Sequence, residues 1–295
     1  YKQLRGICHG KPLVAVTIAE ADYHTPPHLV RLAMAEAAAN GASYLSWPTW
    51  PEKERTRMIS LIRPQADLLR RNEKLLNDAP ARRDAVLFLP FRRWTKTDRC
   101  AAFTLAASLT RANVQYEVIC EDDFLPLPAT KDRGERIPNS LRETKVLLAA
   151  SRSDFGPSEL PKLEKFSRSG GFVITAQETD WLQQVQRAIA KPSIALQAPG
   201  NVRAVVHDQP HRTLVHLLNL NIERLSSFED KVTPASGLQA KVRVPFARVR
   251  SIRALTADVD GTSGPLNFSS RAEGRGAVVE MTVPRLEIAT LVVIE

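Results

Sequence analysis

The chain has 295 residues, of which 43% are hydrophobic and 25% charged, and its formal net charge at pH 7 is +9. This composition is typical of a globular protein with two or three domains, and no apolar run reaches the roughly 20 residues that cross a bilayer. The basic residues are spread in dipeptides such as Arg70-Arg71 and Arg92-Arg93, without the dense patch of a nucleic-acid-binding protein, so we expect neither a membrane nor a nucleic-acid partner.

The first segment, residues 1–78, has the order strand, helix, strand, helix. The first strand is a nearly continuous apolar run, which is typical of a strand covered on both faces. The expected elements are strands over residues 11–19 and 42–47 and helices over residues 29–40 and 52–76. Two βα units cannot close a sheet alone, so the segment predicts part of a larger parallel sheet or barrel.

The second segment, residues 79–190, predicts an open, doubly wound α/β domain. Its expected elements are strands over residues 84–91, 114–120, 144–150 and 172–176 and helices over residues 98–112 and 157–169. The connection over residues 121–143 is long and Pro-rich, which indicates a functional or interface loop.

The third segment, residues 191–295, consists of short runs of alternating hydrophobic and polar residues. Turn residues separate these runs at the spacing of an antiparallel β-sandwich. The fold class expected for the whole chain is therefore α/β followed by all-β.

Several familiar mechanisms have no motif in this sequence. The strand over residues 84–91 is not followed by the G-x-G-x-x-G of a dinucleotide site, and neither a P-loop nor a G-x-S-x-G nucleophile motif is present. Cys8, Cys100 and Cys120 are isolated from one another, without the C-x-x-C pairs of a zinc site. We therefore expect no metal and no cofactor.

Candidate catalytic residues follow the two strands of the first segment. Glu20 and His24 come after the first strand, while Trp47 ends the second, with Trp50 and Glu52 close behind. Catalytic groups of α/β barrels lie at the carboxyl ends of the strands. A carboxylate beside tryptophans is typical of sugar hydrolysis, in which the carboxylate is nucleophile or acid/base and the aromatic face packs against a pyranose.

Each of these residues also has a plainer explanation. Glu20 is a possible loop residue, Trp47 and Trp50 are possible packing residues of a core or its rim, and His24 is a possible turn or helix-start residue. Glu52 stands at a helix start, where the macrodipole favours a carboxylate. Their coincidence at one end of the predicted strands favours a common sugar site.

Three stretches resemble family 42-type β-galactosidases and related glycosidases. "NGASYLSWPTWPE" (40–52) is similar to the last strand of that family's TIM barrel, and "SELPKLEKFSRSGGFVITA" (158–176) to its flavodoxin-like, amidotransferase-like trimerisation domain. "RTLVHLLNLN" (212–221) is similar to the first strands of its C-terminal β-sandwich. The resemblance implies terminal barrel units over residues 1–78, a trimerisation-type domain over residues 79–190 and a sandwich over residues 191–295.

The same resemblance implies a retaining glycoside hydrolase with a carbohydrate substrate and a homo-oligomeric state, as a trimer if the middle domain acts as in the family. Glu20 occupies the place of the family's nucleophile, while Trp47, Trp50, His24 and Glu52 would contact the sugar. No residue matches the acid/base, which the family carries on an earlier barrel strand; Glu52 is the only nearby alternative, and it lies at a helix start. The chain is then either a fragment of a longer enzyme or a remnant that has lost catalysis. The opening "YKQLRGICHG" has the pattern of a helix tail, so we expect the fragment, inactive by itself.

Two other functions remain open at this stage. The first is a non-catalytic oligomerisation or carbohydrate-binding module. The second, a nucleotide- or nucleic-acid-binding α/β protein, depends only on the net charge and the middle segment.

Overall fold

The computed structural model describes residues 1–9, 11–18, 25–47, 50–77, 79–97, 99–125 and 138–295. They form a mixed α/β structure with several sheets, which confirms the broad fold class expected from the sequence. The chain divides into two compact units: unit 1 is Tyr1–Lys11 with Arg83–Ser193, and unit 2 is Pro12–Arg82 with Ile194–Glu295. Within the described residues, no helix combines the length and the apolar character that crossing a membrane requires.

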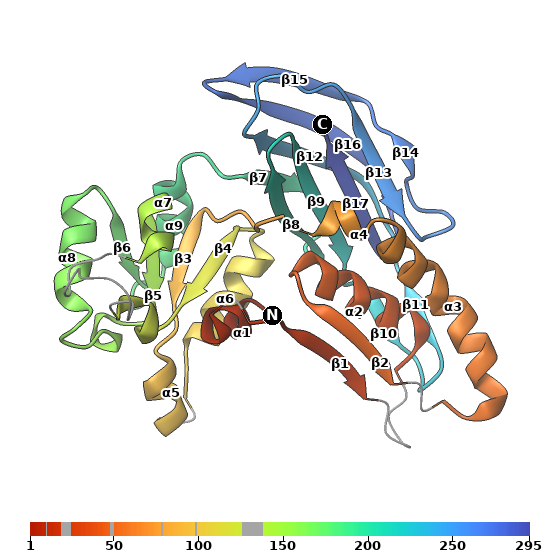
Figure 1. Ribbon diagram of the computed structural model, residues 1–295, viewed down its shortest axis with the longest axis horizontal. Helices are drawn as coiled ribbons and strands as arrows, with labels where there is room; N and C mark the ends of the chain where they lie inside the picture. The colour runs from red at the N-terminus through yellow and green to blue at the C-terminus, as the bar shows by residue number, and fades with distance from the viewer. Residues whose placement is uncertain (10, 19–24, 48–49, 78, 98, 126–137) are drawn as a thin grey trace. The chain divides into compact units, whose positions relative to one another are not determined.

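Unit 1 is built on a parallel sheet with the strand order β4-β3-β5-β6. Its strands are β3 (Ala85–Phe88), β4 (Tyr116–Ile119), β5 (Val146–Ala149) and β6 (Phe172–Thr175). Its helices are α1 (Lys2–Cys8), α5 (Phe91–Thr97), α6 (Ala102–Arg111), α7 (Asn139–Glu143), α8 (Leu160–Arg168) and α9 (Trp181–Ile189). Alternate residues of β3 and β5 enter two separate apolar clusters, because helices cover both faces of the sheet (Figure 1).

Unit 2 begins with two parallel strands and three helices. These are β1 (Val14–Ile18), α2 (Pro27–Ala39), β2 (Ser43–Trp47), α3 (Glu52–Arg71) and α4 (Glu73–Leu76). Among the described residues, β1 and β2 pair only with each other. The expected strand–helix–strand–helix order of this segment is therefore present, as a sheet of two strands.

The rest of unit 2 consists of antiparallel strands. They are β7 (Ile194–Gln197), β8 (Val202–Gln209), β9 (Arg212–Asn219), β10 (Ile222–Arg224), β11 (Asp230–Val232), β12 (Ala235–Val244), β13 (Ile252–Thr256), β14 (Gly264–Pro265), β15 (Phe268–Glu273), β16 (Gly276–Leu286) and β17 (Ala289–Ile294). A five-stranded sheet has the order β14-β13-β17-β9-β8, and a four-stranded sheet has the order β15-β16-β12-β7. Inward side chains of both sheets form one apolar core. Because successive residues of a strand point to opposite faces, this core explains the alternation of hydrophobic and polar residues in the sequence.

Helix α2 packs against the other face of the five-stranded sheet. Ala35 and Ala39 contact Val205 of β8 and Leu218 of β9 in an apolar cluster. The small alanine side chains let the helix lie close to the strands. This packing joins the two βα units to the antiparallel part of unit 2 (Figure 1).

Candidate functional site

The carboxyl ends of β1 and β2 lie side by side. The register of the parallel pair runs from Val14 opposite Ser43 to Ile18 opposite Trp47, so both strands end at the same edge. Glu20 and His24 follow β1 in the sequence but lie outside the described residues, so their positions are not compared with the prediction. Of the predicted site, the described residues include the backbone of Trp47 and the whole of Trp50 and Glu52.

The two faces of the β1–β2 pair differ in burial. Val14, Val16 and Leu45 are 59%, 49% and 47% exposed and alternate along their strands, so they share one face. On the other face, the Tyr44 hydroxyl lies 2.5 Å from Thr17 Oγ1, and the Tyr44 ring packs against the apolar cluster of α2 and α3. Burial raises the pKa of the Tyr44 hydroxyl above its ordinary value. The helices therefore cover one face and leave an apolar face open.

Trp50 lies in the core between α2 and α3. Its side chain belongs to a cluster with Val30, Met34, Met58 and Ile62, and the residue is only 2% exposed. The buried indole Nε1 has no hydrogen-bond partner among the described residues. This position matches the packing explanation of Trp50, because a ring that is covered in this way presents no face to a sugar.

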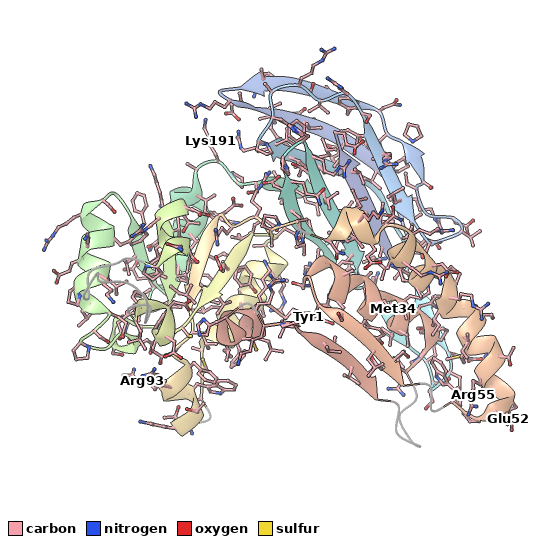
Figure 2. All side chains as sticks on the ribbon, in the orientation of Figure 1. Tyr1, Met34, Glu52, Arg55, Arg93 and Lys191 are labelled. Carbon is pink, nitrogen blue, oxygen red and sulfur yellow. The ribbon has the colours of Figure 1, made fainter. Side chains whose placement is uncertain are left out.

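Glu52 is the first residue of α3 and is exposed. Figure 2 shows Glu52 and Arg55 at the outer end of this helix. A carboxylate in the first helical turn is stabilised by the unpaired N–H groups there, so the position satisfies the structural explanation of Glu52 without requiring a substrate.

The segment that contains Glu20 and His24 is followed by a firmly held helix. Asp230 of β11, whose side chain is 1% exposed, accepts a hydrogen bond from the Leu29 backbone N–H at 3.0 Å, and its other oxygen lies 2.6 Å from His28 Nδ1. The carboxylate thereby satisfies a free N–H in the first turn of α2 and faces the positive end of the helix dipole. The start of α2, which follows the segment with Glu20 and His24 in the sequence, is thus fixed by hydrogen bonds to Asp230.

A second group of chemically active side chains lies in unit 1, where the sequence predicted none. His9, Cys120 and Asp122 place one ligand atom each within 4.8 Å of one another. Burial raises the pKa of the Cys120 thiol to about 11, so this thiol is protonated at neutral pH when no cation is bound. Cys120 is isolated in the sequence because its spatial neighbour His9 is 111 positions away. The one sequence signal for a site here is that Cys120 follows a predicted parallel strand and precedes an acidic run.

Comparison with known proteins identifies structural relatives only. No known family profile matches the sequence, and no curated protein matches it either. The structure is similar to α-L-fucosidase isoenzyme 2 from Paenibacillus thiaminolyticus, with a TM-score of 0.68 and 13% identity over 92% of this chain and 57% of that one. It is also similar to the β-galactosidase from Bacillus circulans sp. alkalophilus, with a TM-score of 0.57 and 12% identity over 95% of this chain and 57% of that one.

A third similar structure is Gan42B, a GH42 β-galactosidase, with a TM-score of 0.55 and 9% identity over 95% of this chain and 55% of that one. At such identities the likeness concerns the fold alone. The chain therefore has a fold found in glycoside hydrolases, which confirms the expected resemblance for the fold. It spans a little over half the length of these proteins.

Proposed function

We propose that this chain is the C-terminal part of a retaining glycoside hydrolase of the family 42 type. In this proposal β1, α2, β2 and α3 are the last two βα units of a TIM barrel. The observation that carries it is the β1–β2 pair, with helices on one face and Val14, Val16 and Leu45 open to solvent on the other. In a closed barrel such side chains fill the interior and further strands pair with both outer edges.

The remaining parts take the roles that the sequence resemblance implies. The parallel sheet of unit 1 is the flavodoxin-like domain through which subunits assemble, as a trimer in the family arrangement. The two antiparallel sheets of unit 2 are the C-terminal β-sandwich. The likeness in fold to a fucosidase and to β-galactosidases supports this assignment.

Glu20 is the proposed nucleophile of this enzyme. It follows the end of β1 by two positions, and the register sets that end beside Trp47 on β2. Trp47 would form the platform for a sugar ring, with His24 and Glu52 at the rim and Trp50 supporting the site from the core. The acid/base would come from another barrel strand, about 5–5.5 Å from Glu20 as retaining chemistry requires.

The test replaces Glu20 in the enzyme with its complete barrel and measures the hydrolysis of aryl glycosides. Glu20→Gln should abolish turnover while sugar binding persists. Glu20→Gly should regain turnover when azide is added, because the small anion attacks the anomeric carbon in place of the carboxylate and gives a glycosyl azide of inverted configuration. Glu73→Gln, at an exposed glutamate of the same unit, is the matched control and should leave turnover unchanged.

Unchanged turnover in Glu20→Gln would remove Glu20 from the mechanism. If no glycoside is hydrolysed while oligosaccharides still bind or the chain self-associates, the alternative of a non-catalytic binding or oligomerisation module takes its place.

A further inference from the structure

Three metal-ligating side chains meet at the carboxyl end of β4 in unit 1. His9 follows α1, Cys120 follows β4, and Asp122 lies in the 3₁₀ turn Glu121–Phe124. The His9 Nε2 to Cys120 Sγ distance is 3.7 Å. Zn–S and Zn–N bonds of about 2.3 and 2.0–2.1 Å at a tetrahedral angle place two such ligands about 3.6 Å apart, so the pair is already at the spacing of a common metal ion.

Asp123 lies beside the His9 imidazole. Its Oδ1 lies 3.5 Å from His9 Nδ1, on the side of the ring opposite Cys120, and its Oδ2 accepts a hydrogen bond from the Cys120 backbone N–H at 2.8 Å. Metal-binding histidines commonly present their second ring nitrogen to a carboxylate, which fixes the tautomer and directs the free nitrogen towards the metal. The cluster contains this outer partner in addition to its three ligands.

The position of His9 is set by the packing of α1 on β4. The Lys2 ammonium donates a hydrogen bond to the Tyr116 carbonyl at 3.0 Å, and Gly6 lies so close to β4 that a Cβ there would be 2.5 Å from the Val118 oxygen. His9 ends the helix in the left-handed conformation, with φ 47° and ψ 52°. The site is therefore built from a helix end and a strand end whose contact is close.

The cluster is open on one side. Cys120 is 2% exposed and forms its inner wall, whereas the His9 and Asp122 side chains are 43% and 42% exposed. Asp122 also pairs with Arg92 through Oδ1, and one of its carboxylate oxygens lies within 4.8 Å of the His9 and Cys120 ligand atoms. A cation can thus enter from solvent, but a substrate carbon cannot reach the thiol, so the Cys-His-Asp set does not suit nucleophilic catalysis.

We propose that His9, Cys120 and Asp122 bind one Zn²⁺ ion, with Asp123 as the positioning residue of His9. The donor set of one imidazole nitrogen, one thiolate sulfur and one carboxylate oxygen suits zinc, whereas Mg²⁺ and Ca²⁺ prefer oxygen ligands alone. Three protein ligands leave a fourth position for water. The site consists of residues of unit 1, whereas the residues of the proposed glycosidase site belong to unit 2.

The test is a titration of the untagged full chain with Co²⁺, followed by displacement with Zn²⁺. Co²⁺ should bind one equivalent and give the near-ultraviolet charge-transfer absorption of a cobalt–thiolate bond, which Zn²⁺ then removes. Cys120→Ser should abolish this absorption. His9→Gln should weaken binding strongly, and Asp123→Asn should weaken it about 10- to 100-fold while keeping the absorption.

The matched controls are the other two cysteines. Cys100→Ser and Cys8→Ser should retain the stoichiometry and the absorption, and circular dichroism should show that every variant is folded. The proposal is overturned if Co²⁺ gives no thiolate absorption, if a folded His9→Gln variant binds as tightly as the parent, or if Cys8→Ser removes the band and Cys120→Ser keeps it.

Discussion

At the scale of single residues, His216 on β9 is a buried acid–base group outside the two candidate sites. The residue is 7% exposed, and its ring lies edge-on to that of His207, with 5.3 Å between the centroids. Burial, followed by the neighbouring His207, lowers the pKa of His216 well below 6.5. His207 itself lies with its two ring nitrogens 2.7 and 2.8 Å from the carbonyl oxygens of Ala79 and Ala39.

This burial predicts that acid destabilises the protein through His216. Below pH 6.5 the unfolded chain takes up a proton at this residue and the folded chain does not, so the free energy of unfolding falls by about 1.4 kcal/mol per pH unit until the lowered pKa is reached. His216→Gln removes the titrating group. Urea unfolding at pH 7.5 and 5.5 should show that the parent loses about 1.4 kcal/mol more than the variant.

A parent and a His216→Gln variant that lose the same free energy between these two pH values would show that His216 does not contribute to the acid sensitivity.

At the scale of elements, α2 is held by a buried ion pair in addition to its apolar contacts. The Arg31 guanidinium pairs with Asp258, and the two side chains are 11% and 1% exposed. Asp258 Oδ2 also accepts hydrogen bonds from the backbone N–H groups of Ile288 and Ala289 at 3.0 and 3.1 Å. One carboxylate thus connects the helix to the turn before β17.

We predict that the two halves of this pair are strongly coupled. Asp258→Asn leaves the Arg31 charge buried without a counter-ion and should cost about 3–5 kcal/mol in the free energy of unfolding. Arg31→Leu should cost less, because backbone N–H groups still hold the carboxylate. The double variant should lose less than the sum of the two, as measured by urea unfolding at pH 7.

Losses that add to within about 0.5 kcal/mol would show that the pair is not coupled.

The contact of α1 with β4 leads to a prediction about Gly6. Alanine in place of glycine ordinarily stabilises a helix by about 1 kcal/mol, but here the new Cβ would lie 2.5 Å from the Val118 carbonyl oxygen. Gly6→Ala should therefore push α1 away from the sheet and destabilise unit 1 by about 1–3 kcal/mol. Leu4 lies on the same helix and is 54% exposed, so Leu4→Ala is the control and should change stability little.

If Gly6→Ala unfolds at a higher urea concentration than the parent, the close packing of α1 on β4 is wrong.

At the scale of the whole molecule, local patterns predict the elements better than their packing. The apolar run over residues 11–19 predicts a strand, and the structure has β1 at Val14–Ile18. The pattern over residues 172–176 likewise matches β6 at Phe172–Thr175. These succeed because side-chain alternation and burial act over a few neighbouring residues. The sequence pattern does not predict the α5 helix (Phe91–Thr97). This helix overlaps the end of the strand predicted over residues 84–91, because Pro90 ends the apolar run.

Contacts between side chains that are far apart in the sequence could not be predicted. Arg31 and Asp258 are 227 positions apart, and His9 and Cys120 are 111 apart, so no spacing rule joins them. Trp50 shows the same limit within the candidate site, since only the packing of α2 on α3 shows that its ring is covered. The two units also join elements that are far apart in the sequence, such as α1 with the parallel sheet of unit 1, and a pattern of elements does not show such packing.

The two units should unfold in separate thermal transitions. Among the described residues, the apolar clusters of the parallel sheet draw on unit 1 alone, and those of the antiparallel sheets and of α2 and α3 draw on unit 2 alone. Chains with more than one core commonly depart from two-state unfolding. Calorimetry should therefore show two transitions, of which Gly6→Ala lowers one and Asp258→Asn the other, by about 2–8 °C per kcal/mol lost. A single transition that both variants lower would mean that the two cores unfold as one cooperative structure.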